Sequence, residues 1–203
     1  MTVIYLHGFA SSPQSNKAQY FRRRFAEQGV EMQIPDLAEG NFEGLTLSSQ
    51  LGVIEGAARD RDDLWLIGSS MGGYLAALYA ARRPEVTRVT LMAPAFGFGR
   101  RWRDMLGPEK VEAWRGTGWL PVFHYGEKRE ARVGFALLED ADQYEDYPDV
   151  SQPTVIFHGS RDDVVPAALS EEFAKLHPQT KLHLMESDHE LLNVLDEMWD
   201  LRF

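Results

Sequence analysis

Three separate stretches of the sequence carry side chains that together could perform acyl transfer. Ser70 lies within a Gly-x-Ser-x-Gly pattern, directly after an apolar run at residues 64–67. Asp162 and His189 each come a few residues after a later apolar run. A serine hydroxyl needs a base within hydrogen-bond reach, and that base needs a third group to orient it. The serine, the histidine and the carboxylate supply these three parts.

The residues around Ser70 are typical of a nucleophile elbow. The apolar run at 64–67 predicts a strand and residues 74–83 predict a helix, which is the context that places a serine hydroxyl on a tight, exposed turn. Gly68 and Gly72 lack a Cβ, so neighbouring backbones can approach them closely. Because short Gly/Ser patterns also occur in ordinary turns, the prediction depends on the flanking elements and on the distant partners.

Strand-like runs alternate with helix-like segments along most of the chain. Six runs predict strands, at residues 3–6, 30–34, 64–67, 86–92, 154–157 and 182–185. This alternation predicts an α/β fold with a mostly parallel sheet and helices on both faces. Ligands of such sheets bind beyond the carboxyl ends of the strands. We therefore expect Ser70, Asp162 and His189 to meet at one edge of the sheet.

The alternation stops after the fourth predicted strand, over residues 96–150. Helical patterns near residues 109–115 and 131–140 alternate there with Gly and Pro, and no strand pattern is visible. A compact domain that carries an insertion of about fifty residues usually uses it, so we expect a helical cap or lid over the site. The whole chain, residues 1–203, then forms a single domain that contains this cap.

Three motifs resemble those of the α/β-hydrolases, and specifically the small bacterial esterases of the YqiA/YcfP type. They are the His-Gly-Phe-Ala-Ser-Ser-Pro stretch at 7–13 with Lys17-Ala18, the elbow at 68–73, and His-Gly-x-x-Asp-x-Val-Val-Pro at 158–166. The resemblance covers essentially the whole chain and implies the α/β-hydrolase fold, with the order Ser, Asp, His along the sequence. It also implies carboxylesterase activity, with thioesterase activity toward acyl chains in some members. The acid of the motif falls on Asp162.

Each predicted role follows from this chemistry. Ser70 is the expected nucleophile, His189 its base, and Asp162 the group that holds the imidazole tautomer. The oxyanion hole is expected from two backbone N–H groups, those of Met71 after the nucleophile and of Phe9 in the first strand's loop. The reaction requires neither a metal nor another cofactor, and its substrate is a small-molecule acyl ester or thioester.

Aromatic and basic side chains are frequent in the insertion. Five aromatic residues are candidates for an acyl pocket: Phe96, Phe98, Trp102, Trp119 and Phe123. The alternative is that they form the core of the cap, which needs bulky apolar side chains to fold. Arg100, Arg101 and Arg103 either meet an anionic leaving group, such as a phosphate-bearing alcohol or thiol, or form a solvated, charged start of a helix.

Other polar residues near the motifs allow simpler interpretations. Asp163 adjoins the matching acid and is an alternative to it, while Asp188 beside the predicted base is expected to be a turn residue. His7 is expected to orient the oxyanion loop, and His158 to play a similar structural part. The acidic residues between 140 and 149 lack the spacing of a calcium loop, so they predict a solvated connection.

Composition excludes several classes of protein. Hydrophobic residues make up 44% of the chain, which indicates a globular protein. A net charge of −10 argues against nucleic acid or an anionic membrane as the main partner. The absence of cysteine excludes disulfides, a thiol nucleophile and thiolate metal sites. No apolar run of membrane length and no basic leader precede the first strand, so a cytoplasmic protein without membrane insertion is expected.

These observations predict a serine hydrolase that cleaves short- to medium-chain acyl esters through an acyl-enzyme. An acyl thioesterase acting on acyl-CoA or acyl-protein is the alternative, because it would use the same nucleophile. A hydrolase fold that only binds is a third hypothesis, opposed by the complete Ser, Asp and His set. Haloalkane dehalogenases and epoxide hydrolases use a carboxylate at the elbow, where this chain has Ser70.

Overall fold

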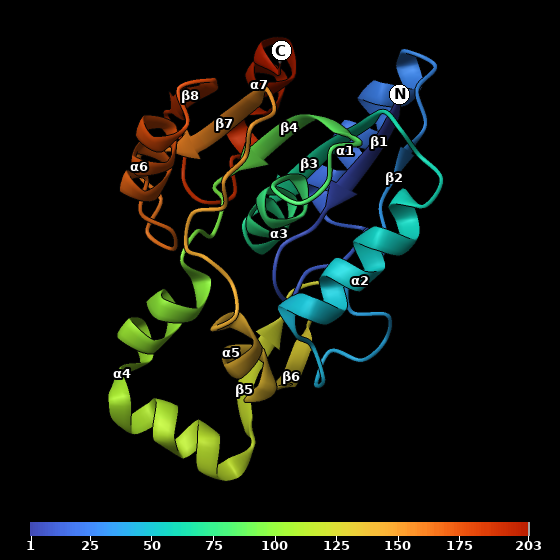
Figure 1. Cartoon of the computed structure of the whole chain (residues 1–203). Coiled ribbons are helices and arrows are strands. Elements are labelled where there is room, and N and C mark those ends of the chain that lie inside the picture. Colours follow the sequence, from blue (N-terminus) through green and yellow to red (C-terminus); the bar gives the residue numbers. More distant parts are fainter. Residues whose placement is uncertain (203) are drawn as a thin grey trace.

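A six-stranded parallel sheet organises the computed structural model, which describes residues 1–202 (Figure 1). The strands are β1 (Thr2–Leu6), β2 (Met32–Gln33), β3 (Leu64–Ser69), β4 (Val86–Met92), β7 (Thr154–Gly159) and β8 (Thr180–Met185). Their order across the sheet is β2-β1-β3-β4-β7-β8, and all neighbouring pairs are parallel. The predicted α/β fold is confirmed.

Helices cover both faces of the sheet, as its apolar strands require. They are α1 (Asn16–Glu27), α2 (Leu47–Ala58), α3 (Met71–Ala80), α6 (Ala168–Leu176) and α7 (Leu195–Leu201), with a 3₁₀ turn at Leu192–Val194 before α7. Successive strand residues point to opposite faces. Val3 and Tyr5 of β1 accordingly belong to the buried cluster that includes residues of α1 and α7, whereas Ile4 and Leu6 belong to the cluster that includes residues of α2, α3 and α6. Strands buried on both faces explain the continuous apolar runs in the sequence.

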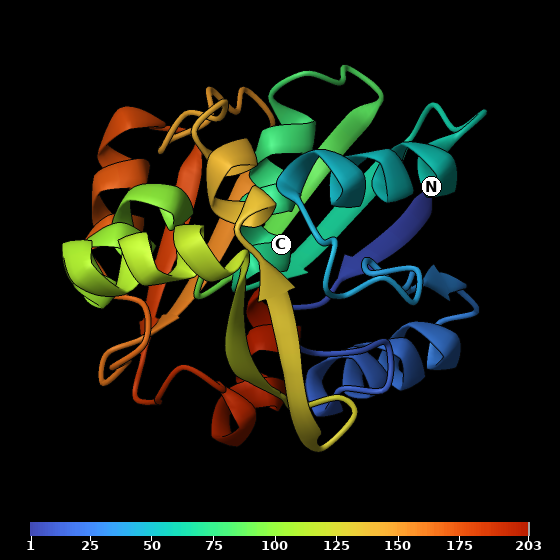
Figure 2. The ribbon, with the colours of Figure 1, turned by 90° about the horizontal axis from the view of Figure 1, so that it is seen from below.

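The segment between β4 and β7 leaves the sheet and returns to the neighbouring strand. It contains α4 (Phe98–Thr117), β5 (Trp119–His124), β6 (Arg129–Gly134) and α5 (Ala136–Ala141). In Figure 1 these elements lie together below the sheet, and Figure 2 views them from that side. Helix α4 bends at Gly107, whose φ of 75° is not helical and which precedes Pro108.

The expectation of a purely helical insertion is wrong. Strands β5 and β6 form an antiparallel hairpin that pairs Trp119 with Gly134 and His124 with Arg129. The helix predicted over 131–140 is therefore strand up to Gly134, and only its second half is helical. Contacts from outside the hairpin stabilise it, because the Gly134 N–H donates to the Glu43 carbonyl. The helix predicted at residues 109–115 lies within α4, as expected.

Candidate active site

Ser70 occupies the turn between β3 and α3 in a strained conformation. Its φ of 55° and ψ of −118° lie in a region that side-chain-bearing residues rarely adopt, at a cost of about 1–3 kcal/mol. Neighbouring backbone stabilises this turn: the Ser70 N–H donates to the Met92 carbonyl (2.9 Å), and the Ser70 carbonyl accepts from the Ala95 N–H (3.0 Å). The turn thus presents the Ser70 side chain at the carboxyl end of β3.

Close backbone contacts explain both glycines of the elbow. A Cβ on Gly72 would collide with the carbonyl groups of Leu6 and His7 at the end of β1. A Cβ on Gly68 would collide with the carbonyl of Gly72 itself. The start of α3 therefore reaches the sheet only because both positions lack a side chain.

His189 lies between the other two predicted members of the site. Its Nε2 is 3.2 Å from the Ser70 Oγ, and its Nδ1 is 2.7 Å from the Asp162 Oδ2. The three residues follow β3, β7 and β8, so the parallel sheet brings them together at one edge. Because an ionised carboxylate only accepts hydrogen bonds, Nδ1 carries the proton and Nε2 is free to accept one from the hydroxyl. This geometry is within the reach required for general base catalysis.

The Asp162 carboxylate is fully buried and accepts hydrogen bonds at both oxygens. Oδ1 accepts from the N–H groups of Val164 (2.9 Å) and Val165 (2.8 Å), while Oδ2 faces His189. Burial raises the pKa of Asp162, but hydrogen bonds from His158, His189 and the Val165 N–H outweigh it and lower that pKa below its ordinary value. The carboxylate is therefore ionised at neutral pH.

The two neighbouring acids differ from Asp162 in their surroundings. Asp163 is exposed at the surface of the loop. Asp188 accepts at Oδ1 from the N–H groups of Glu190 (3.0 Å) and Leu191 (3.3 Å), which is the expected geometry of a turn residue. Of the three acids, Asp162 is the one that the structure places on His189.

His158 is completely buried behind the Asp162 carboxylate. Its Nε2 lies 2.8 Å from the Val165 carbonyl and 3.2 Å from the Asp162 Oδ2, and its Nδ1 lies 2.7 Å from the Ser170 Oγ. Since a carbonyl only accepts, Nε2 carries the proton and Nδ1 accepts from the Ser170 hydroxyl. His158 thus fixes the position of the carboxylate and of the loop that follows it.

The loop after β1 is fixed in a similar way by His7. The buried His7 ring has its Nδ1 3.0 Å from the Gly8 carbonyl, and its Nε2 accepts from the Leu37 N–H (3.2 Å). Burial lowers the pKa of His7, so the ring is neutral, which this donor and acceptor pattern requires. The loop lies beside the elbow, since a Cβ on Gly8 would be 3.4 Å from the Ser70 Cβ.

Two backbone donors near Ser70 are unused. Within residues 1–202, the N–H groups of Phe9 and Met71 donate to no protein acceptor. Met71 directly follows Ser70, and Phe9 follows the glycine that lies against it. Free N–H groups on both sides of a serine are the elements of an oxyanion hole. The role of Phe9 and Met71 as an oxyanion hole stays a prediction.

Lys17 has a structural relation to the site that the sequence analysis did not identify. Its side chain on α1 is 8% exposed, and its Nζ donates to the Glu190 carbonyl (2.9 Å), one residue after His189. Burial lowers the pKa of Lys17, and the charges of Glu190, Asp162 and Asp188 oppose that effect. A lysine on the apolar stripe of a helix, four residues before Phe21, was the available signal.

The candidate aromatic residues divide into three groups. Phe96 and Phe98 are buried, and Phe96 stacks on Phe173 with ring centres 4.4 Å apart, so both contribute to the core. Trp102 lies edge-on against the Phe9 ring at 5.1 Å, next to the predicted oxyanion loop. Trp119 and Phe123 belong to the hairpin.

Those two hairpin residues are placed away from the core. The Arg132 guanidinium lies 4.1 Å from the centre of the Trp119 ring, and the half-exposed Phe123 contacts Tyr125. Another aromatic residue, Phe42, packs against Phe9 with ring centres 5.3 Å apart. The Phe9 ring is therefore flanked by Trp102 of α4 and by Phe42, which lies in the loop between β2 and α2.

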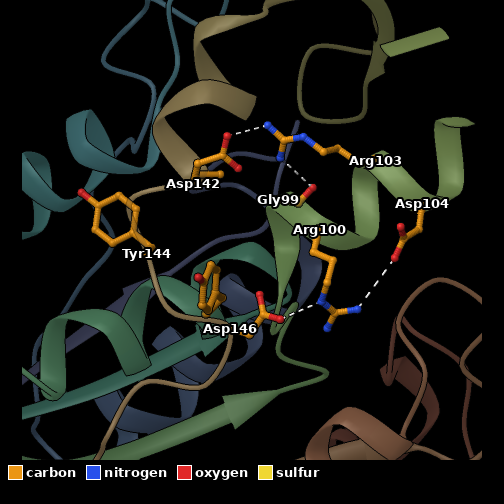
Figure 3. Close-up of a pocket in the computed structure, with 9 residues that line it drawn as sticks. Gly99, Arg100, Arg103, Asp104, Asp142, Tyr144 and Asp146 are labelled. Carbon is orange, nitrogen blue, oxygen red and sulfur yellow. Dashed lines mark hydrogen bonds and ion pairs between the residues drawn. The ribbon is translucent and has the colours of Figure 1, made fainter. Parts of the chain in front are cut away.

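Ion pairs join the basic start of α4 to the acidic connection after α5. Arg100 pairs with Asp146 (2.7 Å), and Arg103 pairs with Asp142 (2.7 Å). Figure 3 shows these pairs around a cavity of about 360 Å³. Arg101 instead donates to the Val164 carbonyl (2.7 Å). Two of the acidic residues, Asp142 and Asp146, thus bind arginines of α4, which a solvated connection does not describe fully.

A second cavity of about 290 Å³ lies beside the loop after β1, between that loop and the hairpin. Its lining includes Ser11, Ser12, Phe42 and His124. Neither of these two cavities is lined by Ser70, Asp162 or His189. No helix within residues 1–202 is long and apolar enough to cross a membrane.

The strand order, the elbow after β3 and the helices on both faces define the α/β-hydrolase fold. The chain belongs to the family described as uncharacterised protein family UPF0227, whose model matches residues 2–202. Among solved structures, it is similar to the alpha/beta hydrolase domain-containing protein 10 from mouse, with 21% identity, a TM-score of 0.81, and coverage of 99% of this chain and 89% of that one.

Two further structures share the fold along nearly the whole chain. A putative hydrolase from Agrobacterium vitis S4 is 24% identical, with a TM-score of 0.84 and coverage of 99% of this chain and 86% of that one. Est1E from Butyrivibrio proteoclasticus is 20% identical, with a TM-score of 0.73 and coverage of 98% and 84%. Likeness at these identities establishes the common fold.

Proposed function

We propose that this protein is a serine hydrolase that cleaves carboxylic esters with short- to medium-chain acyl groups. The observation that carries the proposal is the continuous hydrogen-bonded arrangement of the Ser70 hydroxyl, the His189 ring and the Asp162 carboxylate, at 3.2 and 2.7 Å. Unused N–H groups of Phe9 and Met71 beside the hydroxyl support the same reaction class. A fold shared with lipolytic enzymes and with Est1E is consistent with it.

The proposed reaction has two stages. His189 Nε2 accepts the Ser70 proton while Oγ bonds to the acyl carbon, and the resulting oxyanion is stabilised by the N–H groups of Phe9 and Met71. The carbon–oxygen bond to the leaving group then breaks, and His189 gives that oxygen its proton. Water repeats the sequence on the acyl-Ser70 ester with His189 as base, releasing the acid and restoring the hydroxyl. Asp162 stabilises the imidazolium in both stages.

We further propose that the insertion at residues 96–150 is a cap on this site. It contacts loops that belong to the site at three points. The Gly126 N–H of the hairpin turn donates to the Ala10 carbonyl (3.2 Å), Trp102 packs against Phe9, and Arg101 donates to the Val164 carbonyl. These contacts support a role of the insertion in enclosing the substrate.

Substitution of Ser70 tests the function. Wild type should hydrolyse p-nitrophenyl butyrate and react with a fluorophosphonate probe, whereas Ser70→Ala should not be labelled and should lose kcat by a factor of about 10⁴ or more. Ser160→Ala removes an exposed hydroxyl and serves as the matched control. A folded Ser70→Ala variant with wild-type activity would contradict the proposal, as would failure of the probe to label wild type.

An acyl thioesterase would use the same residues, so the leaving group must be tested directly. Matched butyryl esters and thioesters compared by kcat/KM distinguish the two substrate classes. Higher values for the thioester would assign the site to thioester substrates while leaving the roles of Ser70, His189 and Asp162 unchanged.

A further inference from the structure

The first turn of α4 reaches two loops of the proposed active site. Arg101 donates from Nη2 to the carbonyl of Val164, in the loop whose N–H groups bind Asp162. The next residue, Trp102, lies edge-on against Phe9 in the proposed oxyanion loop. Consecutive residues of one helix thus contact both loops, so this turn bridges the loop that carries Asp162 and the proposed oxyanion loop.

Arg101 differs from its two neighbours in the same turn. Arg100 is paired with Asp146 (2.7 Å) and Asp104 (3.8 Å), and Arg103 is paired with Asp142 (2.7 Å). In the described part of the chain, Arg101 has no carboxylate within ion-pair distance, and its side chain makes a single hydrogen bond, to Val164. A guanidinium has five N–H donors, so most of those on Arg101 remain available.

The environment of Arg101 favours an anionic partner. Its side chain is partly buried, and burial lowers its pKa while the nearby Asp162 charge opposes that change. Arginine nevertheless stays protonated in proteins, so an unneutralised cation remains beside the site. Desolvating such a cation is costly unless a counter-charge approaches it. The chain has a net charge of −10 and as a whole repels anions, but the positive charge of Arg101 attracts an anion locally.

We propose that Arg101 binds an anionic group, a carboxylate or a phosphate, on the leaving-group portion of the substrate. The planar guanidinium matches both groups with paired hydrogen bonds. The proposed mechanism indicates that Arg101 faces the leaving group and not the acyl group. His189 must protonate the leaving group, and Arg101 is hydrogen-bonded to the loop that carries Asp162, the partner of His189. This inference rests on the proposed function and assigns its substrate class.

Three aryl butyrates that share an acyl group test the assignment: 4-butyryloxybenzoate, its neutral methyl ester, and 4-butyryloxyphenyl phosphate. Arg101→Gln keeps a donor for the Val164 carbonyl but removes the charge. We expect it to lower kcat/KM for at least one anionic ester by a factor of about 10 to 100, mainly through KM, and to leave the neutral ester within about threefold. The anionic ester that responds identifies carboxylate or phosphate as the natural partner.

Arg100→Gln is the matched control, because it removes a charge from the same turn that is already paired. It should not change the ratio between anionic and neutral substrates. An equal loss on all three esters in Arg101→Gln would overturn the proposal, because it would show that Arg101 only joins α4 to the Val164 loop. An unchanged ratio of kcat/KM between the anionic esters and the neutral ester in Arg101→Gln would overturn the proposal as well.

A binding measurement separates this inference from the esterase proposal. Calorimetric titration with 4-hydroxybenzoate and with 4-hydroxyphenyl phosphate, the anionic leaving groups themselves, requires no catalysis. Wild type should bind one of them at least about tenfold more tightly than Arg101→Gln does. Equal binding by both proteins would contradict the role of Arg101 even in an active esterase, and a selective loss would support it even if none of the esters were cleaved.

Discussion

The edge of the sheet and the insertion that lies beside it are held together by different kinds of contact. At the edge, Ser70, His189 and Asp162 come from three strand ends and are joined by short hydrogen bonds around a fully buried carboxylate. The insertion is joined to the rest of the chain by exposed polar contacts, such as the ion pair of Arg82 with Glu145, by aromatic contacts such as Trp102 with Phe9, and by buried side chains that share the core cluster of the sheet. Further exposed ion pairs, such as Arg100 with Asp146, lie within the insertion.

This difference indicates how each region responds to change. A buried hydrogen-bonded carboxylate cannot lose a partner without leaving polar groups unsatisfied, so the edge is expected to have one working geometry. Exposed ion pairs contribute about 0–1 kcal/mol each, so single changes at the ion pairs of the insertion should alter selectivity or local stability while the reaction continues. The following predictions test this contrast, beginning with the largest expected effect.

Replacing the carboxylate should affect the rate most. Asp162→Asn is expected to lower kcat by a factor of about 10⁴, because an amide at this position favours the wrong imidazole tautomer and does not stabilise the imidazolium. Asp163→Asn, in the exposed neighbouring residue, should remain within about threefold of wild type. The reverse result in p-nitrophenyl butyrate assays would transfer the role of the acid to Asp163.

The contribution of Asp162 to the free energy of unfolding should depend on pH, and the Asp162→Asn variant can measure this dependence. The pKa of Asp162 in the folded protein lies below its ordinary value of 3.8. Its stabilising contribution is therefore complete above that value and is lost as the pH falls through the lower, folded pKa. Urea unfolding should show a free-energy gap between wild type and Asp162→Asn that is constant from about pH 7 to 5 and narrows below about pH 4. A gap that widens toward acid would contradict this.

Adding a methyl group at the elbow should destabilise the fold. Gly72→Ala places a Cβ against the carbonyl groups of Leu6 and His7, so we expect a loss of about 3 kcal/mol or more in the free energy of unfolding. Gly52→Ala in α2 is the matched control, because nothing lies within 4 Å of its Cβ. It should stabilise the protein by about 0.5–1 kcal/mol through helix propensity. Equal changes in the free energy of unfolding for Gly72→Ala and Gly52→Ala would show that the backbone around the elbow can move to accommodate the added Cβ.

Replacing Lys17 should affect the reaction rate but should not lower the stability of the fold. Lys17→Met removes a buried ammonium, so the free energy of unfolding should stay the same or rise, while kcat falls about tenfold because the loop after His189 loses its anchor. KM for a neutral ester should not change. Lys175→Met, at an exposed site on α6, should leave both quantities unchanged. Lower stability with unchanged kcat would assign Lys17 to the fold alone.

The smallest effect is expected in the insertion. Arg103→Gln removes the pair with Asp142 and should lower the free energy of unfolding by about 0.5–1 kcal/mol, less at high salt, with unchanged kcat on a neutral ester. Arg22→Gln, at an exposed position on α1, is the control. A loss of several kcal/mol, or a large fall in kcat, would show that an exposed ion pair within the insertion matters as much as the buried hydrogen bonds of the sheet edge.

The sequence predicts the inner strands well because β1, β3 and β7 are buried on both faces. Strand β4 has the predicted bounds, residues 86–92. Strands β3 and β7 run two residues further than predicted, through Gly68-Ser69 and His158-Gly159, which the apolar pattern does not include. Strand β2 is shorter than predicted, with two residues, because little of it pairs with β1 at the edge of the sheet.

The hairpin could not be predicted by the same reasoning. Strand β5 is only partly buried, and its apolar residues at 119–120 and 122–123 are separated by Pro121, which argues against a strand in the sequence. Proline is accepted there because a two-stranded ribbon consists of edge strands. The contacts that stabilise the hairpin come from Glu43 and Ala10, far away in the sequence.

For the candidate site, residue type and order along the chain indicated Ser70 and His189, while the resemblance to a family motif favoured Asp162 over Asp163. The structure places these three side chains within hydrogen-bond distance, and their catalytic roles stay predictions. The partners of Lys17 and Arg101 are backbone carbonyl groups, of Glu190 and Val164. Since every residue has a carbonyl, no sequence pattern marks which one will accept. Such contacts become visible only when the chain is folded.

The turn of the β5–β6 hairpin has a consequence for recombination between relatives. The insertion begins and ends on adjacent strands, β4 and β7, so a foreign segment could replace it without interrupting the sheet. The Gly126 N–H, however, donates to Ala10, the neighbour of Phe9, and a Cβ on Gly126 would collide with Ser12. A transplanted segment therefore has to bring a glycine with a free N–H to the position of Gly126, or the graft will change the loop after β1 together with the insertion.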